Sequence, residues 1–129
     1  MNRHIIIVSA HPDDMEIGMG GTVAKLGESQ ALITSVVITD GGRASNPFAW
    51  TEQRMAEVRR EEALRAARVL GVQEVVFFDQ PDAAEEIDVH TVKRKLLELL
   101  VRLQPARGQI GEGKRTGVRH RSGRRSVGI

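Results

Sequence analysis

The chain has 129 residues, of which 40% are hydrophobic and 28% are charged, a composition typical of one soluble globular domain. It contains no cysteine, which excludes a disulfide framework, a thiolate nucleophile and a Cys-based zinc site. No apolar run approaches the roughly 20 residues that cross a bilayer, and the first residues lack the pattern of a secretion signal. We therefore expect a cytoplasmic protein without a membrane span.

The net charge of +2 is divided unevenly along the chain. Residues 1–105 hold 12 of the 19 basic residues and 16 of the 17 acidic ones, whereas residues 106–129 combine the other 7 basic residues with 6 glycines. The apolar residues of this segment are few and scattered, so they cannot form one face of a core. Residues 106–129 are therefore predicted to be a basic tail, disordered or out of register with what precedes it. Residues 1–105 are predicted to form the folded domain.

Three apolar, β-branched runs predict strands. They cover His4–Ser9, Leu32–Thr39 and Val75–Phe78, and their unbroken apolar character is typical of strands covered on both faces.

Segments with helical periodicity separate these strands. One follows the glycine-punctuated stretch after Asp14 and runs to about Glu28, and another covers Thr51–Leu70 and stops at Gly71. A last helix is capped by Asp88 and ends before Pro105.

This alternation predicts an α/β fold with a doubly wound, mostly parallel sheet. Polar clusters follow the three strands at Ala10–Asp14, Asp40–Arg43 and Asp79–Asp82. Because active groups gather at the carboxyl ends of parallel strands, we expect these clusters to converge on one site.

The cluster His11-Pro12-Asp13-Asp14 contains the chemistry of a metal site. An imidazole and a carboxylate on a sharp turn can both face one cation, and both suit a catalytic zinc with an open water position. The remaining carboxylate, Asp13, can then act as general base. In the alternative interpretation the cluster is a surface turn in which Asp14 caps the following helix.

The string from Val8 to Thr22, Val-Ser-Ala-His-Pro-Asp-Asp-Met-Glu-Ile-Gly-Met-Gly-Gly-Thr, resembles the signature of the LmbE-like/PIG-L deacetylases. The similarity continues through Ile38–Gly41, Arg59–Gly71 and Pro81–Asp82, and covers roughly residues 4–105. It implies a Rossmann-like α/β fold, a zinc ion, and hydrolysis of an N-acetyl group from an N-acetylglucosamine-type amino sugar or glycoconjugate.

The resemblance also implies roles for individual residues. His11 and Asp14 match metal ligands, Asp13 matches the general base, and Arg59 and Asp82 match positions that contact the sugar. Two alternatives stay open: Arg59 can be an ordinary helical partner of Glu62, and Asp82 can be a turn residue.

Four residues within the signature are predicted to be structural, with the glycines letting the helix approach the sheet. They are Glu16, Gly18, Gly20 and Gly21.

The chain departs from the family pattern after Pro105. The family takes a third zinc ligand from a His-x-Asp-His segment after a fourth strand, and only His120 lies at a comparable distance here. Its neighbours Arg119, Arg121 and Arg124 would repel a dication. Family members are also typically about twice as long. We therefore expect an amino-terminal portion of such a protein, whose open sheet edge favours a homo-oligomer and which can be an inactive fragment.

Three other classes of protein fit the sequence less well. A receiver-like phosphoacceptor domain would use Asp13 and Asp14 for magnesium and Asp79 as acceptor, but no suitable lysine follows. The glycines do not satisfy Gly-x-Gly-x-x-Gly, which argues against dinucleotide binding. The basic tail has no aromatic residue for base stacking, so no specific nucleic-acid binding is expected.

Overall fold

The computed structural model describes residues 3–105, 108–109 and 126–127. Its main sheet has three parallel strands in the order β1-β2-β3, namely β1 (His4–Ser9), β2 (Leu32–Thr39) and β3 (Glu74–Gln80). The first two have the predicted bounds, whereas β3 begins one residue earlier and ends two residues later than predicted. The parallel α/β prediction is confirmed.

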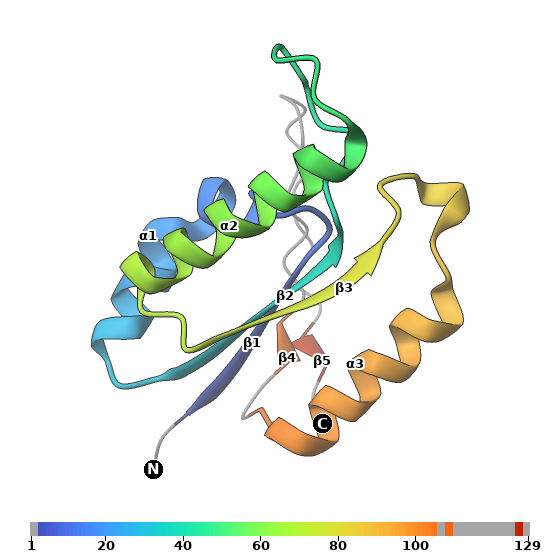
Figure 1. Cartoon of the computed structure of the whole chain (residues 1–129). Helices are drawn as coiled ribbons and strands as arrows, with labels where there is room; N and C mark the ends of the chain where they lie inside the picture. Colours follow the sequence, from blue (N-terminus) through green and yellow to red (C-terminus); the bar gives the residue numbers. More distant parts are fainter. Residues whose placement is uncertain (1–2, 106–107, 110–125, 128–129) are drawn as a thin grey trace.

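Helices cover both faces of this sheet (Figure 1). On one face lie α1 (Asp14–Glu28) and α2 (Glu52–Leu70), and on the other lies α3 (Val89–Leu103), which follows the short 3₁₀ helix η1 (Ala84–Glu86). This arrangement is the predicted doubly wound architecture.

Strand alternation divides the apolar side chains between two cores. The core under α1 and α2 contains Ile7, Ile33 and Val75, and the core under α3 contains Val36, Val76 and Phe78. Because neighbouring strand residues enter opposite cores, the apolar character of the runs is explained by burial of both faces.

Polar caps fix the ends of the helices. The hydroxyl of Thr51 accepts a hydrogen bond from the backbone N–H of Arg54, 3.1 Å away, at the start of α2, and Gly71 ends this helix with φ of 79°. At the start of α3, the carboxylate of Asp88 accepts from the backbone N–H of Thr91 at 3.1 Å. The predicted stop at Gly71 and cap at Asp88 are confirmed.

A different glycine from those predicted lets α1 approach its neighbours. A Cβ at Gly27 would lie 2.7 Å from the carbonyl oxygen of Leu70, so α1 and the end of α2 meet at a glycine. A Cβ at Gly18, Gly20 or Gly21 would meet nothing within 4 Å. The prediction that these three glycines allow close packing was therefore wrong, since an added Cβ has open space at each position; they lie around Met19, whose φ of −151° kinks the helix.

Beyond Pro105 the structure describes two short strands, β4 (Gly108–Gln109) and β5 (Ser126–Val127), which pair in antiparallel fashion. His120 and its neighbouring arginines lie outside the described residues. Among the helices that are described, none combines the length and apolar character needed to cross a membrane.

Candidate active site

The polar clusters after β1, β2 and β3 lie together at the carboxyl edge of the sheet, as predicted. Backbone hydrogen bonds join the strand ends: Thr39 donates its N–H to the carbonyl of Ala10 at 2.8 Å, and Asp40 donates to Gln80 at 3.0 Å. The loops that leave these strands therefore begin side by side.

The turn between β1 and α1 is closed by Asp14. Its Oδ2 atom accepts a hydrogen bond from the backbone N–H of His11 at 3.0 Å and lies 3.3 Å from the Nδ1 atom of the same histidine. The N-cap position of α1 is occupied by Asp13, whose side chain makes no capping hydrogen bond. The carboxylate of Asp14 thus holds the imidazole instead of capping the helix, and that of Asp13 is not used for capping either.

Asp82, from the loop after β3, contacts the other side of the same imidazole. Its Oδ1 atom lies 3.0 Å from Nε2 of His11, and its Oδ2 atom accepts a hydrogen bond from the backbone N–H of Arg43 at 3.1 Å. The side chain of Asp82 is only 11% exposed. This one carboxylate therefore links the loops after β1, β2 and β3.

The side chain of Arg43 connects the loop after β2 to η1 and to the start of α2. Its guanidinium lies 3.3 Å from Glu86 in η1 and 3.4 Å from Glu52 at the start of α2. The negative charges of Glu86 and then Glu52 raise the pKa of Arg43 above its ordinary value. Arg43 belongs to the polar cluster predicted after β2, and its position directly after a strand end was the sequence signal for this linking role.

Two glycines allow the loop after β2 to pass close to His11. Gly41 has φ of 69°, and a Cβ there would lie 2.9 Å from Cδ of Pro12. Gly42 donates its N–H to Oδ1 of Asp40 at 2.8 Å. The Asp-Gly-Gly sequence thus forms a tight turn against the pyrrolidine ring of Pro12, the residue after His11.

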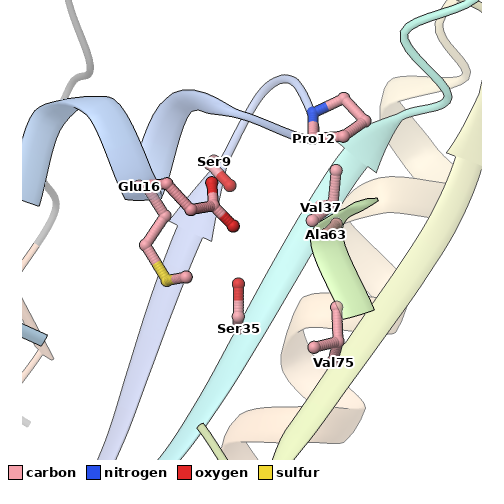
Figure 2. Close-up of a pocket in the computed structure, with 8 residues that line it drawn as sticks. Ser9, Pro12, Glu16, Ser35, Val37, Ala63 and Val75 are labelled. Carbon is pink, nitrogen blue, oxygen red and sulfur yellow. The ribbon is translucent and has the colours of Figure 1, made fainter. Parts of the chain in front are cut away.

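Glu16 lies beneath this turn, on the first turns of α1. Figure 2 shows its carboxylate pointing from the helix into a small internal pocket, toward the hydroxyl of Ser35 on β2 and beside Ser9 on β1. Its Oε2 atom is buried without a hydrogen-bond partner among the described residues. Burial raises the pKa of Glu16 above its ordinary value, a backbone hydrogen bond partly opposes this, and the charges of Asp13 and Asp14 raise it further.

The donor types at this site suit zinc, whereas their present arrangement supplies only part of a ligand set. An imidazole and aspartate oxygens are ordinary zinc ligands. Asp14 and Asp82, however, contact opposite nitrogens of His11, and in the described part of the chain no three His, Asp or Glu side chains surround a common point. The residues therefore fit two of the ligands that the sequence predicts, His11 and Asp14, and the third predicted ligand, His120, lies outside the described residues.

Arg59 lies at the edge of the site. Its aliphatic stem would lie 3.7 Å from a Cβ on Gly41, while its guanidinium lies 3.2 Å from Glu62. The helical pair that was one alternative for Arg59 is therefore present, and the stem still reaches the loop next to Pro12.

Asp79, the acceptor in the receiver-like alternative, is paired with a base. Its two carboxylate oxygens lie 3.0 and 3.3 Å from NH1 of Arg60 on α2. It stands apart from the contacts that join His11, Asp14 and Asp82.

The parallel sheet, with a histidine and several aspartates at its carboxyl edge, is that of a Rossmann-like α/β protein. Residues 6–107 match the family described as "PIG-L: GlcNAc-PI de-N-acetylase". Because the match covers most of the chain, the protein belongs to the PIG-L family, as the signature predicted.

Several curated relatives are named as deacetylases. The chain is 32% identical over 80 residues to a diacetylchitobiose deacetylase from Thermococcus kodakarensis, covering 62% of the chain and 30% of the relative. It is 29% identical over 102 residues to a probable N-acetyl-α-D-glucosaminyl L-malate deacetylase 2 from Bacillus anthracis, covering 77% and 45%. A relative with another activity, 4-oxalmesaconate hydratase from Pseudomonas putida, is 34% identical over 108 residues, covering 80% and 41%.

Solved structures give the same two activities. The N,N′-diacetylchitobiose deacetylase from Pyrococcus horikoshii matches with a TM-score of 0.74 and 31% identity, covering 80% of this chain and 38% of that one. The 4-carboxy-2-hydroxymuconate hydratase from Pseudomonas putida matches with a TM-score of 0.71 and 32% identity, covering 80% and 44%. The chain thus spans less than half the length of each of these relatives.

Proposed function

We propose that this chain contains the amino-terminal part of the active site of a zinc-dependent hydrolase that removes the N-acetyl group from an N-acetylglucosamine-type amino sugar or glycoconjugate. The observation that carries the proposal is the imidazole of His11 held between Asp14 and Asp82 at the carboxyl edge of the sheet. Membership of the PIG-L family and the names of the deacetylase relatives support it.

In this proposal His11 and Asp14 hold the zinc, and a third donor comes from outside the described residues, with His120 as the candidate in this chain. When bound, zinc polarises the amide carbonyl and makes water a stronger nucleophile at neutral pH.

Asp13 acts as the general base. Its carboxylate takes a proton from the attacking water as the new C–O bond forms, and delivers a proton to the amine nitrogen as the C–N bond breaks. Acetate and the free amino sugar are the products. Asp82 and Arg59 contact the sugar. The contacts of the Asp82 carboxylate with the ring of His11 and the backbone N–H of Arg43 hold that carboxylate in position to bind the sugar.

Calorimetric titration of the purified chain with zinc tests the proposal, with His11→Ala as the control. One zinc per chain, lost in His11→Ala, is expected, together with acetate release from N,N′-diacetylchitobiose that Asp13→Asn abolishes. Zinc binding without acetate release would identify an inactive family fragment. A folded chain that binds no zinc would contradict the zinc-dependent part of the proposal.

A second candidate is a hydratase that adds water to an unsaturated tricarboxylic acid. The observation that favours it is the 34% identity to 4-oxalmesaconate hydratase, which is as high as the identity to the deacetylases. A carboxylate that takes a proton from water serves both reactions. Incubation with 4-oxalmesaconate separates them, because hydration changes its ultraviolet absorbance and releases no acetate.

A further inference from the structure

The loop between β2 and α2 projects beyond the carboxyl edge of the sheet (Figure 1). Its two ends lie close together, because a Cβ on Gly42 would be 3.0 Å from the carbonyl oxygen of Glu52. The Nε atom of Arg43 also lies 3.4 Å from Oε1 of Glu52. A compact surface loop with adjacent ends is an Ω-loop, a type of loop that frequently carries function.

Hydrogen bonds within this loop hold its far end in one conformation. The side chain of Asn46 accepts the backbone N–H of Trp50 at 3.0 Å and donates to the backbone carbonyl of the same residue. Ala49 has φ of 53° and donates its N–H to the carbonyl of Asn46 at 3.4 Å. Because the loop is already ordered, binding a ligand here costs little further conformational entropy.

The far end of the loop presents a stacked aromatic pair. The ring centroids of Phe48 and Trp50 lie 4.7 Å apart, with 24° between the ring planes. The guanidinium carbon of Arg54 lies 5.8 Å from the centroid of Trp50. Phe48 nevertheless remains 66% exposed. Trp50 therefore supports a ring whose remaining surface is open to a ligand.

The far end of the loop is also apolar and uncharged. Residues 44–51 include no charged residue, and residues 47–49 (Pro-Phe-Ala) have no polar side chain. Sugar hydroxyls need hydrogen-bonding partners, and the amide group of Asn46 is already bound to Trp50. Aromatic rings instead attract one another beyond the gain from burial alone. This surface therefore suits a flat apolar or aromatic group better than a further sugar ring.

The charges around the base of the loop argue against a membrane surface as its ligand. Arg43 is paired with Glu52 and Glu86, and Arg54 lies 3.6 Å from Glu57. Contact with anionic lipid uses an excess of basic residues beside the apolar ones. Among the described residues at the base of the loop, these pairs leave no such excess.

The base of the loop is joined to the candidate active site. The backbone N–H of Arg43 donates to Oδ2 of Asp82, whose Oδ1 lies 3.0 Å from His11. A sugar ring held at Asp82 would therefore lie at the base of this loop. We propose that Phe48, supported by Trp50, binds a flat apolar or aromatic group attached to the N-acetylated ring, so that the loop selects glycosides bearing such a group. This inference rests on the proposed deacetylase function and adds a substrate class to it.

Trp50 makes the test specific, because it is the single tryptophan of a chain that has no tyrosine. Its emission is followed while the chain, with zinc present, is titrated with phenyl or methyl N-acetyl-β-D-glucosaminide. Excitation is at the red edge of the indole band, where the phenyl group does not absorb, and calorimetry gives the affinities. The phenyl glycoside is expected to change the emission and to bind about two- to tenfold more tightly than the methyl glycoside, the usual gain from one aromatic pair.

Three variants locate the preference for the phenyl glycoside. Phe48→Ala should make the two affinities equal. Asn46→Ala, which releases the backbone of Trp50, should reduce the preference although both aromatic rings remain. Val69→Ala is the matched control, because it changes an exposed apolar residue near the far end of α2, and it should leave the preference as it is in the unmodified chain.

Equal affinities for the two glycosides in the unmodified chain, or a preference that survives in Phe48→Ala, would overturn the inference while leaving the deacetylase proposal intact. A change in Trp50 emission with phosphatidylcholine vesicles and none with the phenyl glycoside would also overturn it, since the loop would then contact a membrane. Phenyl β-D-glucoside, which lacks the acetamido group, separates the two proposals. If it binds as tightly as the N-acetylated phenyl glycoside and loses affinity equally in Phe48→Ala, the aromatic site is supported and the deacetylase proposal is contradicted.

Discussion

The Nε2 atom of His11 lies 3.0 Å from Oδ1 of Asp82, which joins the turn after the first strand to the loop after the third. The opposite ring nitrogen lies 3.3 Å from Asp14. A neutral imidazole carries one N–H, so a metal ion at one nitrogen leaves the other to donate to a carboxylate. Such a partner fixes the orientation of a ligating histidine.

Asp82→Ala is therefore expected to weaken zinc binding by about 10- to 100-fold, the usual effect of removing a partner of a ligating histidine. The expectation holds whichever ring nitrogen binds zinc. If zinc binds Nδ1, Asp82 accepts the N–H of Nε2 and holds the ring in place; if zinc binds Nε2, Asp82 can supply a further oxygen ligand to the ion. Calorimetry measures the change. Asp79→Ala, three residues earlier near the end of β3 and paired with Arg60, is the matched control and should bind zinc as the unmodified chain does. Equal losses in both variants would show that this part of the chain as a whole matters, and not the contact with His11.

Gly41→Ala should disturb both stability and the metal site. The φ of 69° at Gly41 costs a residue with a side chain about 1–2 kcal/mol, and the new Cβ would lie 2.9 Å from Cδ of Pro12. Displacement of Pro12 moves the neighbouring His11, so zinc affinity should fall together with the free energy of unfolding. Urea unfolding and zinc titration measure the two effects.

Gly18→Ala is the control for this change, because a Cβ at Gly18 meets nothing within 4 Å. It should lower neither quantity. If Gly41→Ala lost stability but retained full zinc affinity, the contact with Pro12 would have no part in positioning His11.

The arrangement of strands and helices was predictable because each element carries a local signal. The β-branched runs at His4–Ser9 and Leu32–Thr39 specified two strands with their observed bounds, since strands buried on both faces tolerate few polar residues. Asp88 and Gly71 marked helix ends because capping is a local interaction between neighbouring residues.

The contacts inside the site were less predictable, because they depend on loops that meet only in the folded chain. The sequence indicated that Asp82 follows a strand, but not that its carboxylate contacts both His11 and the backbone of Arg43. The role of the glycines was mispredicted for the same reason: helical position alone does not distinguish Gly27, which faces Leu70, from Gly21, which faces open space.

Glu16→Gln should change the pH dependence of stability. The pKa of Glu16 is raised above its ordinary value of 4.5 in the folded chain, chiefly by burial, so the folded chain holds this proton more tightly than the unfolded chain does. The stability linked to that proton is fully present below the unfolded pKa and is lost as the pH rises through the folded pKa. Glutamine keeps the shape and cannot ionise, so the variant should gain stability relative to the unmodified chain as the pH rises above the ordinary pKa of 4.5, and the gain should level off above the raised pKa of the folded chain.

Urea unfolding with a chelator present measures this difference across the pH range. Glu28→Gln, an exposed change on the same helix, controls for the loss of one negative charge from α1. If the difference in the free energy of unfolding between Glu16→Gln and the unmodified chain stays constant with pH, burial does not disfavour the ionised carboxylate of Glu16.

Gly27→Ala should destabilise the chain by about 1–3 kcal/mol, the usual cost of forcing extra atoms into a packed contact. The added Cβ would lie 2.7 Å from the carbonyl oxygen of Leu70 and 3.3 Å from Cα of Gly71, and both obstacles are backbone atoms that cannot rotate away. Gly21→Ala, on the same helix with open space around it, should instead stabilise the chain by about 0.5–1 kcal/mol, because alanine favours the helical conformation. Urea unfolding should therefore show changes of opposite sign in the free energy of unfolding for the two variants. Destabilisation of equal size in both would contradict the close approach of α1 to the end of α2, because the cost would then come from the helix backbone.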